Sequence, residues 1–113
     1  MARKLDETIT LDFTTHNPIT GQVSDADFLP TCEVFEDTTD IPILTPVVTK
    51  RVGLTGDHRV SFVASAANGF EINKSYNVVA TATVAGVTAK ARIDTFNIEA
   101  TIVSPGGAGG FSV

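Results

Sequence analysis

Several residue types are scarce in this sequence, and each scarcity argues against a class of protein. One cysteine among 113 residues excludes an internal disulfide and any metal site built from several cysteines. Tryptophan is absent, and the single tyrosine and seven phenylalanines fall mostly at inward-looking positions, so an exposed aromatic platform for stacking sugars is not expected. Eight Lys and Arg residues against 13 Asp and Glu residues give a net charge of -5. This balance argues against a nucleic-acid or anionic-membrane binder.

Long apolar runs are also missing. No segment approaches the ~18 consecutive apolar residues that a membrane-spanning helix needs. Residues 1–7 begin with basic side chains but lack the apolar stretch of a secretory signal, so we expect a protein made in a cytoplasm. The length fits a single domain, and 42% hydrophobic residues are enough to form a core.

The dominant periodicity of the sequence is two, which indicates β-strands. The expected strands run over residues 8–14, 31–36, 43–52, 59–64, 76–84 and 87–99. Prolines flank and interrupt the 43–52 segment, which is typical of an edge or kinked strand. Ala85 and Gly86 predict a two-residue hairpin between the last two strands. A change of alternation in the final strand predicts a bulge near Asp94 and Thr95.

Six to seven short strands, with no 3.6-residue apolar stripe, predict an all-β fold: a single antiparallel β-sandwich. The expected division of the chain is an extended N-terminal arm over residues 1–6, the sandwich over 7–103 and a C-terminal arm over 104–113. The last segment is Gly-rich, which is typical of a flexible tail.

Residues with chemical potential are few. Asp57, His58 and Ser61 contain the side chains of a catalytic triad, but neighbours in a strand point to opposite faces, so Asp57 would not orient His58. His16 lies in a polar strand end and is expected to be solvated. Two histidines and one cysteine have no recognisable zinc spacing. We therefore predict no catalytic residues, no metal site and no cofactor.

Two loop segments, 25–27 and 36–40, are rich in carboxylates. Calcium favours loop oxygens, although neither segment matches the EF-hand pattern. The simpler expectation is that these carboxylates stabilise turns, and the sequence leaves calcium binding open. Cys32 alternates with Val34 in a predicted strand and is expected to be a small, buried and unreactive side chain.

Two hairpin-like sequences carry a resemblance to a known family. One is GFEINKSYNVVATATVAGV at residues 69–87, followed by DTFNI at 94–98, and the other is PTCEVFED at 30–37 with IPIL at 41–44. Both resemble immunoglobulin-like domains of tailed-bacteriophage virion proteins, over about residues 7–99. The resemblance implies an immunoglobulin-like sandwich, and it carries over no catalytic residue.

The resemblance also implies a function. It points to a non-enzymatic structural protein of a tailed-phage particle, first of all a capsid decoration or cementing subunit. The alternatives are a head–tail or tail component, or a receptor- or glycan-binding module on the virion surface; a small hydrolase is a more distant third. The implied partners are the major capsid protein or tail and connector subunits, together with copies of the chain itself. The implied location is the virion, assembled in the host cytoplasm, without nucleic-acid or membrane contacts.

The ends of the chain supply the candidate contact residues. Edge strands and extended arms offer main-chain pairing to neighbouring subunits. The candidate interface residues are Arg3, Lys4, Thr101, Ile102, Val103, Phe111 and Val113. Phe111 and Val113 follow the Gly-rich spacer, and ordering a spacer costs roughly 1–2 kcal/mol per residue. We therefore expect the tail to dock only with further contacts in an assembly.

Overall fold

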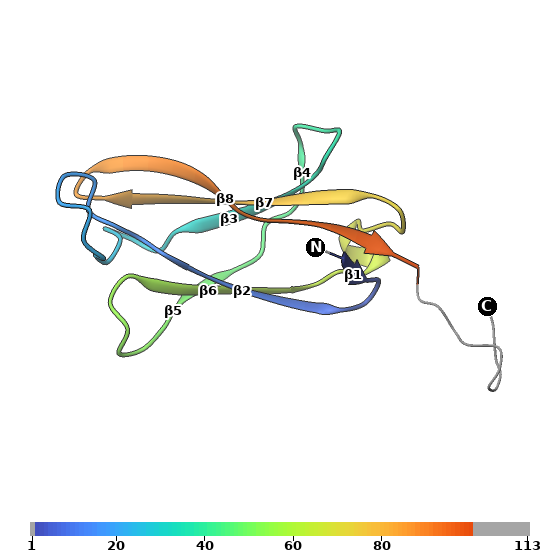
Figure 1. The fold of residues 1–113 in the computed structure, drawn as a ribbon, viewed down its shortest axis with the longest axis horizontal. Coiled ribbons are helices and arrows are strands. Elements are labelled where there is room, and N and C mark those ends of the chain that lie inside the picture. The colour runs from blue at the N-terminus through green and yellow to red at the C-terminus, as the bar shows by residue number, and fades with distance from the viewer. Residues whose placement is uncertain (1, 101–113) are drawn as a thin grey trace.

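The computed structural model describes residues 2–100 as an all-β fold of two packed sheets, a β-sandwich (Figure 1). One sheet has the strand order β1-β8-β7-β3-β4 and the other β2-β6-β5. The elements are β1 (Ala2–Lys4), β2 (Thr8–Thr14), β3 (Thr31–Glu36), β4 (Pro42–Leu44), β5 (Val48–Lys50), β6 (Asp57–Val63), the 3-10 helix η1 (Ala66–Asn68), β7 (Ser75–Val84) and β8 (Val87–Glu99). The all-β prediction is confirmed, with eight strands rather than six or seven.

The alternation of apolar and polar residues in the sequence matches the alternation of buried and exposed side chains along the strands. In β6 the side chains of His58, Val60 and Phe62 are buried, while those between them are exposed. In β7 the buried side chains are those of Tyr76, Val78, Ala80 and Val84. Burying each large apolar side chain contributes about 1.5–3 kcal/mol. The alternating face is therefore what holds the two sheets together.

The predicted strand at 43–52 is wrong, because the chain forms two short strands there. β4 pairs with β3 in the larger sheet, whereas β5 pairs with β6 in the smaller one. Between them the buried Pro46, which has no N–H to donate to a ladder, lies where the chain passes from one sheet to the other. Residues 2–4, expected within an extended arm, form β1 and pair in parallel with Asn97–Glu99.

The β7–β8 hairpin follows the prediction. Ala85 and Gly86 have φ values of 51° and 77°, the positive pair that a type I′ turn requires. The ladder shifts register where Val79 pairs with Arg92 and Val78 with Asp94, leaving Ile93 as the extra residue. The bulge thus lies directly before the predicted position.

An aromatic cluster fills one end of the sandwich. Phe70 packs against Tyr76 and Phe96 with ring centroids 4.7 and 6.2 Å apart, and Phe62 lies 5.8 Å from Phe70. All four side chains are buried, in company with Ile98. Aromatic pairs at these distances add to the burial energy. We call this region, next to β1, the closed end.

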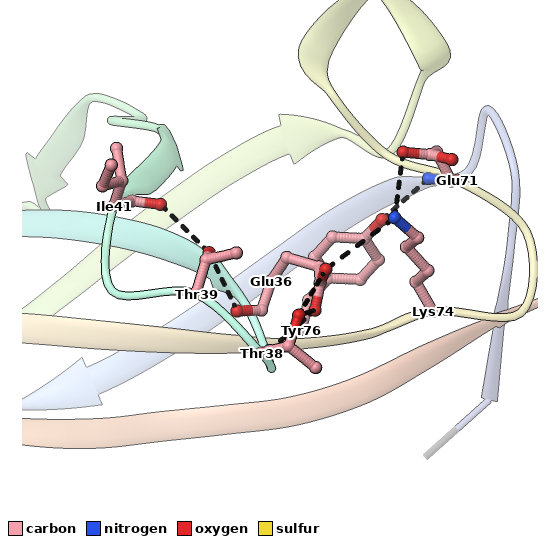
Figure 2. A network of polar contacts seen from close by, with 7 residues as sticks. All are labelled: Glu36, Thr38, Thr39, Ile41, Glu71, Lys74 and Tyr76. Atoms are coloured by element: carbon pink, nitrogen blue, oxygen red, sulfur yellow. Dashed lines mark hydrogen bonds and ion pairs between the residues drawn. The ribbon is translucent and has the colours of Figure 1, made fainter.

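A polar network ties the loops of the closed end to one another (Figure 2). The carboxylate of Glu36 accepts the backbone N–H of Thr38 at 2.7 Å, which is the largest reason why its pKa lies below the ordinary value. Lys74 Nζ lies 3.3 Å from Glu71 and 3.8 Å from Glu36. The Tyr76 hydroxyl accepts the backbone N–H of Glu71 at 2.8 Å. These contacts fix the β3–β4 turn beside the segment that leads into β7.

Candidate functional site

The three side chains that superficially compose a triad do not meet. All three lie on β6, where His58 faces the sandwich interior, while Asp57 and Ser61 occupy the alternate positions. Ser61 is exposed and its hydroxyl lies 3.1 Å from that of Thr10 on β2. The strand geometry therefore separates the imidazole from both the carboxylate and the hydroxyl.

The environment of His58 is that of a packed core side chain. It is 2% exposed and stacks on Phe13, with ring centroids 5.4 Å apart. Burial lowers the pKa of His58 below its ordinary value, because the charged imidazolium is poorly solvated there. Its Nδ1 has no hydrogen-bond partner within residues 2–100. His16, in contrast, is exposed and forms an isolated bridge with Val23.

The loop carboxylates hold turns in place. Asp25 accepts the backbone N–H of Gly56, and Asp27 accepts those of Ala85 and Gly86 at 3.0 and 2.8 Å. Asp27 thereby anchors the turn between β7 and β8. Within residues 2–100 no group of three or more His, Cys, Asp or Glu side chains is arranged to hold a metal ion.

Cys32 lies on β3 with no exposed surface, so its predicted burial is confirmed. Desolvation raises the pKa of the thiol to about 11. Since the thiolate is the reactive form, a slow reaction with thiol reagents in the native state stays our prediction.

The N-terminal interface candidates are engaged within the chain. Arg3 forms an ion pair with Glu7 at 2.8 Å, and Lys4 forms one with Glu99 at 3.2 Å. The backbone N–H of Lys4 also donates to Glu7, and this bond is the main reason why the pKa of Glu7 is lowered. The remaining candidates fall outside the residues that the structure describes; they are Thr101, Ile102, Val103, Phe111 and Val113.

A feature that the sequence reasoning missed is the open outer edge of β8. On the side of β8 away from β7, β1 covers only Asn97–Glu99, and no strand of residues 2–100 pairs with that side from Val87 to Phe96. Every residue from Val87 to Arg92 is exposed. We call the segment from Val87 to Arg92 the β8 edge; it begins at the hairpin tip, at the left of Figure 1, far from β1.

A cavity of about 180 Å³ opens beside the β8 edge. Small or medium apolar side chains line it from β7 and β8, together with Lys90. The rest of its lining comes from β2 and the residues that follow it: Phe13, Thr14, Thr15, His16 and Pro18. The apolar side chains from the two strands of the hairpin are Ala80, Ala82, Val84, Val87, Ala89, Ala91 and Ile93. The sheets are therefore less completely filled here than at the closed end, and we call this region the open end.

The cationic side chains of the β8 edge differ from the other Lys and Arg side chains in their ion pairing. The six other Lys and Arg side chains each have a carboxylate oxygen within 3.5 Å; these residues are Arg3, Lys4, Lys50, Arg51, Arg59 and Lys74. Lys90 and Arg92 have no carboxylate within 4.0 Å among residues 2–100. In an acidic protein, the two cations that have no ion pair within the described part of the chain thus occupy one face of one strand. This pattern becomes visible only once the long-range ion pairs are known.

None of the helical structure in residues 2–100 has the length and apolar character required to cross a bilayer. Searches against protein-family models, curated proteins and solved structures find no match for this chain.

Proposed function

We propose that the chain is an immunoglobulin-like domain. If β2 to β8 are matched to strands B, C, C′, D, E, F and G, the larger sheet contains G-F-C-C′ and the smaller one B-E-D. These are the neighbour relations of immunoglobulin sandwiches, and β1 adds a parallel strand beside G.

The observation that carries this assignment is the bond made by Tyr76. Immunoglobulin domains often place a tyrosine near the start of strand F, with its hydroxyl bonded to the backbone a few residues upstream. Tyr76 is the second residue of β7, and its hydroxyl accepts the N–H of Glu71. It is also the only tyrosine of the chain.

The proposed domain departs from antibody domains in its core. Antibody domains pair a tryptophan on strand C with a disulfide between B and F. This chain has no tryptophan, and its one cysteine is Cys32 on β3. The aromatic cluster of the closed end occupies the interior in place of these groups, and many sandwich domains of other families likewise lack them.

We further propose that the domain is a non-enzymatic structural subunit of a tailed-phage particle, foremost a capsid decoration. The sequence resemblance of residues 30–44 and 69–98 supports this role. A rigid sandwich supplies shape, and strand edges supply adhesion to neighbouring subunits. The partners proposed are the major capsid protein, or tail and connector proteins, and copies of the chain itself.

A receptor-binding module is the second candidate, and a specific observation favours it. The β2–β3 segment and the β7–β8 turn lie at the same end of the sandwich, where variable immunoglobulin domains carry binding loops. Ile19, Phe28 and Leu29 of that segment are 88%, 65% and 51% exposed. Apolar side chains on such loops can contact a host surface.

The copy number in purified particles tests the function and separates the two candidates. Quantitative mass spectrometry of the particles should detect the chain in many copies if it decorates the capsid, and in few if it reads a receptor. A reconstruction of the particle should then show the sandwich seated on capsid subunits. Absence of the chain from the particles would contradict both roles.

A further inference from the structure

We propose that the β8 edge is a docking site for an extended segment of another protein, in which acidic residues alternate with apolar residues. The segment would add a strand to the larger sheet beside β8. Three separate features of residues 2–100 lead to this partner chemistry: an edge backbone that no strand there covers, two cations without an ion pair there, and the cavity on the inner side of the edge. The inference does not depend on the phage role proposed above.

Within residues 2–100 no strand pairs with the outer side of the β8 edge, and the edge is held in place. Because the type I′ turn makes Val84 and Val87 a hydrogen-bonded pair, alternate residues of β8 direct their N–H and C=O groups away from β7. Thr88 and Lys90 are such residues, and their outward groups, which have no backbone partner within residues 2–100, can pair with an incoming strand. Asp27 secures the turn, so the edge is ordered before a partner arrives. Preorganisation of this kind lowers the entropic cost of binding.

The outer face of the β8 edge favours carboxylates. Lys90 and Arg92 alternate along this face and have no carboxylate within 4.0 Å among residues 2–100. Asp37 and Asp40 line a shallow hollow together with Arg92, but neither forms an ion pair with it. A strand added beside β8 would place alternate side chains directly opposite these two cations, where opposite charges stabilise the pair.

The same charges disfavour a second copy as the occupant. Antiparallel pairing of two identical β8 edges would bring the Lys90 and Arg92 side chains of both copies onto one face. Like charges directly opposite one another are destabilising, and edge lysines are a common protection against self-pairing. The two cations therefore disfavour pairing between two β8 edges and favour pairing with an acidic strand.

The inner face of the β8 edge favours apolar side chains. Val87, Ala89 and Ala91 point toward the cavity, and Phe13 lines it from β2. Because the alanines are small, space remains that a partner's larger apolar side chains can fill. Such strand addition uses backbone bonds for affinity and alternate side-chain contacts for specificity.

A peptide titration with the full chain tests the site. The probe is a short, capped, fluorescein-labelled peptide in which Glu alternates with Val, and binding is followed by fluorescence anisotropy. Two controls have matched length: one arranges the same Glu and Val residues in blocks, and the other replaces every Glu with Lys. We expect saturable binding of the alternating acidic peptide alone, weakened by added salt.

Variants separate the charge from the backbone contribution. The double variant Lys90→Glu with Arg92→Glu should weaken binding by at least about tenfold. Thr88→Pro removes one outward N–H and keeps both cations, so it should also abolish binding. Its matched control, Thr88→Val, keeps that N–H and should bind like the wild type. Thermal melts monitored by circular dichroism establish that each variant is folded.

The outcomes decide the proposal. Amide shifts of Thr88 and Lys90 on addition of the alternating peptide, lost in the Thr88→Pro variant, would support strand addition. Equal binding of the block peptide, or unchanged binding by a folded Thr88→Pro variant, would overturn it in favour of a general basic patch. Concentration-dependent self-association through the β8 edge, seen by sedimentation without peptide, would also overturn it, because a second copy would then be the occupant.

Discussion

The closed end and the open end of the sandwich use the same two strands in different ways. At the closed end, β7 and β8 contribute Tyr76, Phe96 and Ile98, which are buried among other aromatic groups. At the open end, the same strands contribute Ala82 and Ala89, beside a cavity and an uncovered edge. Interiors are normally close-packed, so the difference suggests that stability is concentrated at the closed end. The open end is left available for contacts.

The largest difference between the ends should appear on truncation of Phe96. Phe96→Ala removes a buried ring that contacts Phe70 and Tyr76, and should lower the free energy of unfolding by about 3–5 kcal/mol. The matched truncation at the open end, Val87→Ala, should change it by less than about 0.5 kcal/mol, because Val87 is 51% exposed. Urea unfolding followed by circular dichroism measures both. Comparable losses would show that the two ends are equally packed.

Removal of the Tyr76 hydroxyl should lower the free energy of unfolding by a smaller amount. Tyr76→Phe keeps the ring but leaves the Glu71 N–H without its acceptor, which should cost about 1–2 kcal/mol. The control at the open end is Thr88→Val, which removes an exposed hydroxyl contact with Thr83 and should cost less than about 0.5 kcal/mol. Chemical denaturation of the two variants provides the comparison. If Tyr76→Phe is as stable as the wild type, the hydroxyl bond contributes nothing to the closed end.

The two ends also differ in how far the sequence revealed them. Alternation is a local signal, so it predicted the segments of β2, β3, β7 and β8 and the burial of Cys32. It did not resolve the short strands: β4 and β5 take the place of the predicted 43–52 strand, yet they join different sheets. Long-range pairing decides such cases, and no local pattern contains it.

The candidate site was harder to predict than the fold. Arg3 and Lys4 stood out as isolated charges near the N-terminus, but the structure pairs them with Glu7 and Glu99. Lys90 and Arg92 did not stand out in the sequence, because their lack of ion pairs within residues 2–100 depends on where the carboxylates lie after folding. The open edge likewise follows from the shortness of β1, which an alternating pattern over three residues cannot reveal.

His58 provides a pH-dependent comparison of the two ends. Its pKa is lowered from 6.5 by burial beside Phe13, so below that pH the unfolded chain binds a proton that the folded chain resists. Stability should therefore be complete above pH 6.5 and fall as the pH decreases. The variant His58→Leu should flatten this dependence between about pH 5 and 6.5, a window above the titration of ordinary carboxylates.

Hydrogen exchange locates the effect of His58. Amides near Phe13 and His58 should lose protection on acidification through this window, while those near Phe96 keep theirs. Stability measured by urea unfolding at each pH gives the total effect. An unchanged pH dependence in His58→Leu would show that another group is responsible for the acid sensitivity.

The smallest expected effect comes from adding volume at the open end. Ala89→Val places two further methyl groups beside the cavity of about 180 Å³, and a β-branched residue suits a strand, so stability should change by less than about 0.5 kcal/mol. The matched control is Ala64→Val, at a position with no exposed surface after β6, where overpacking should cost about 1–3 kcal/mol. Thermal and urea unfolding of the two variants compare the same chemical change in both surroundings. If Ala89→Val is as damaging as Ala64→Val, the open end is already filled in solution and has no room for the apolar side chains of a docked strand.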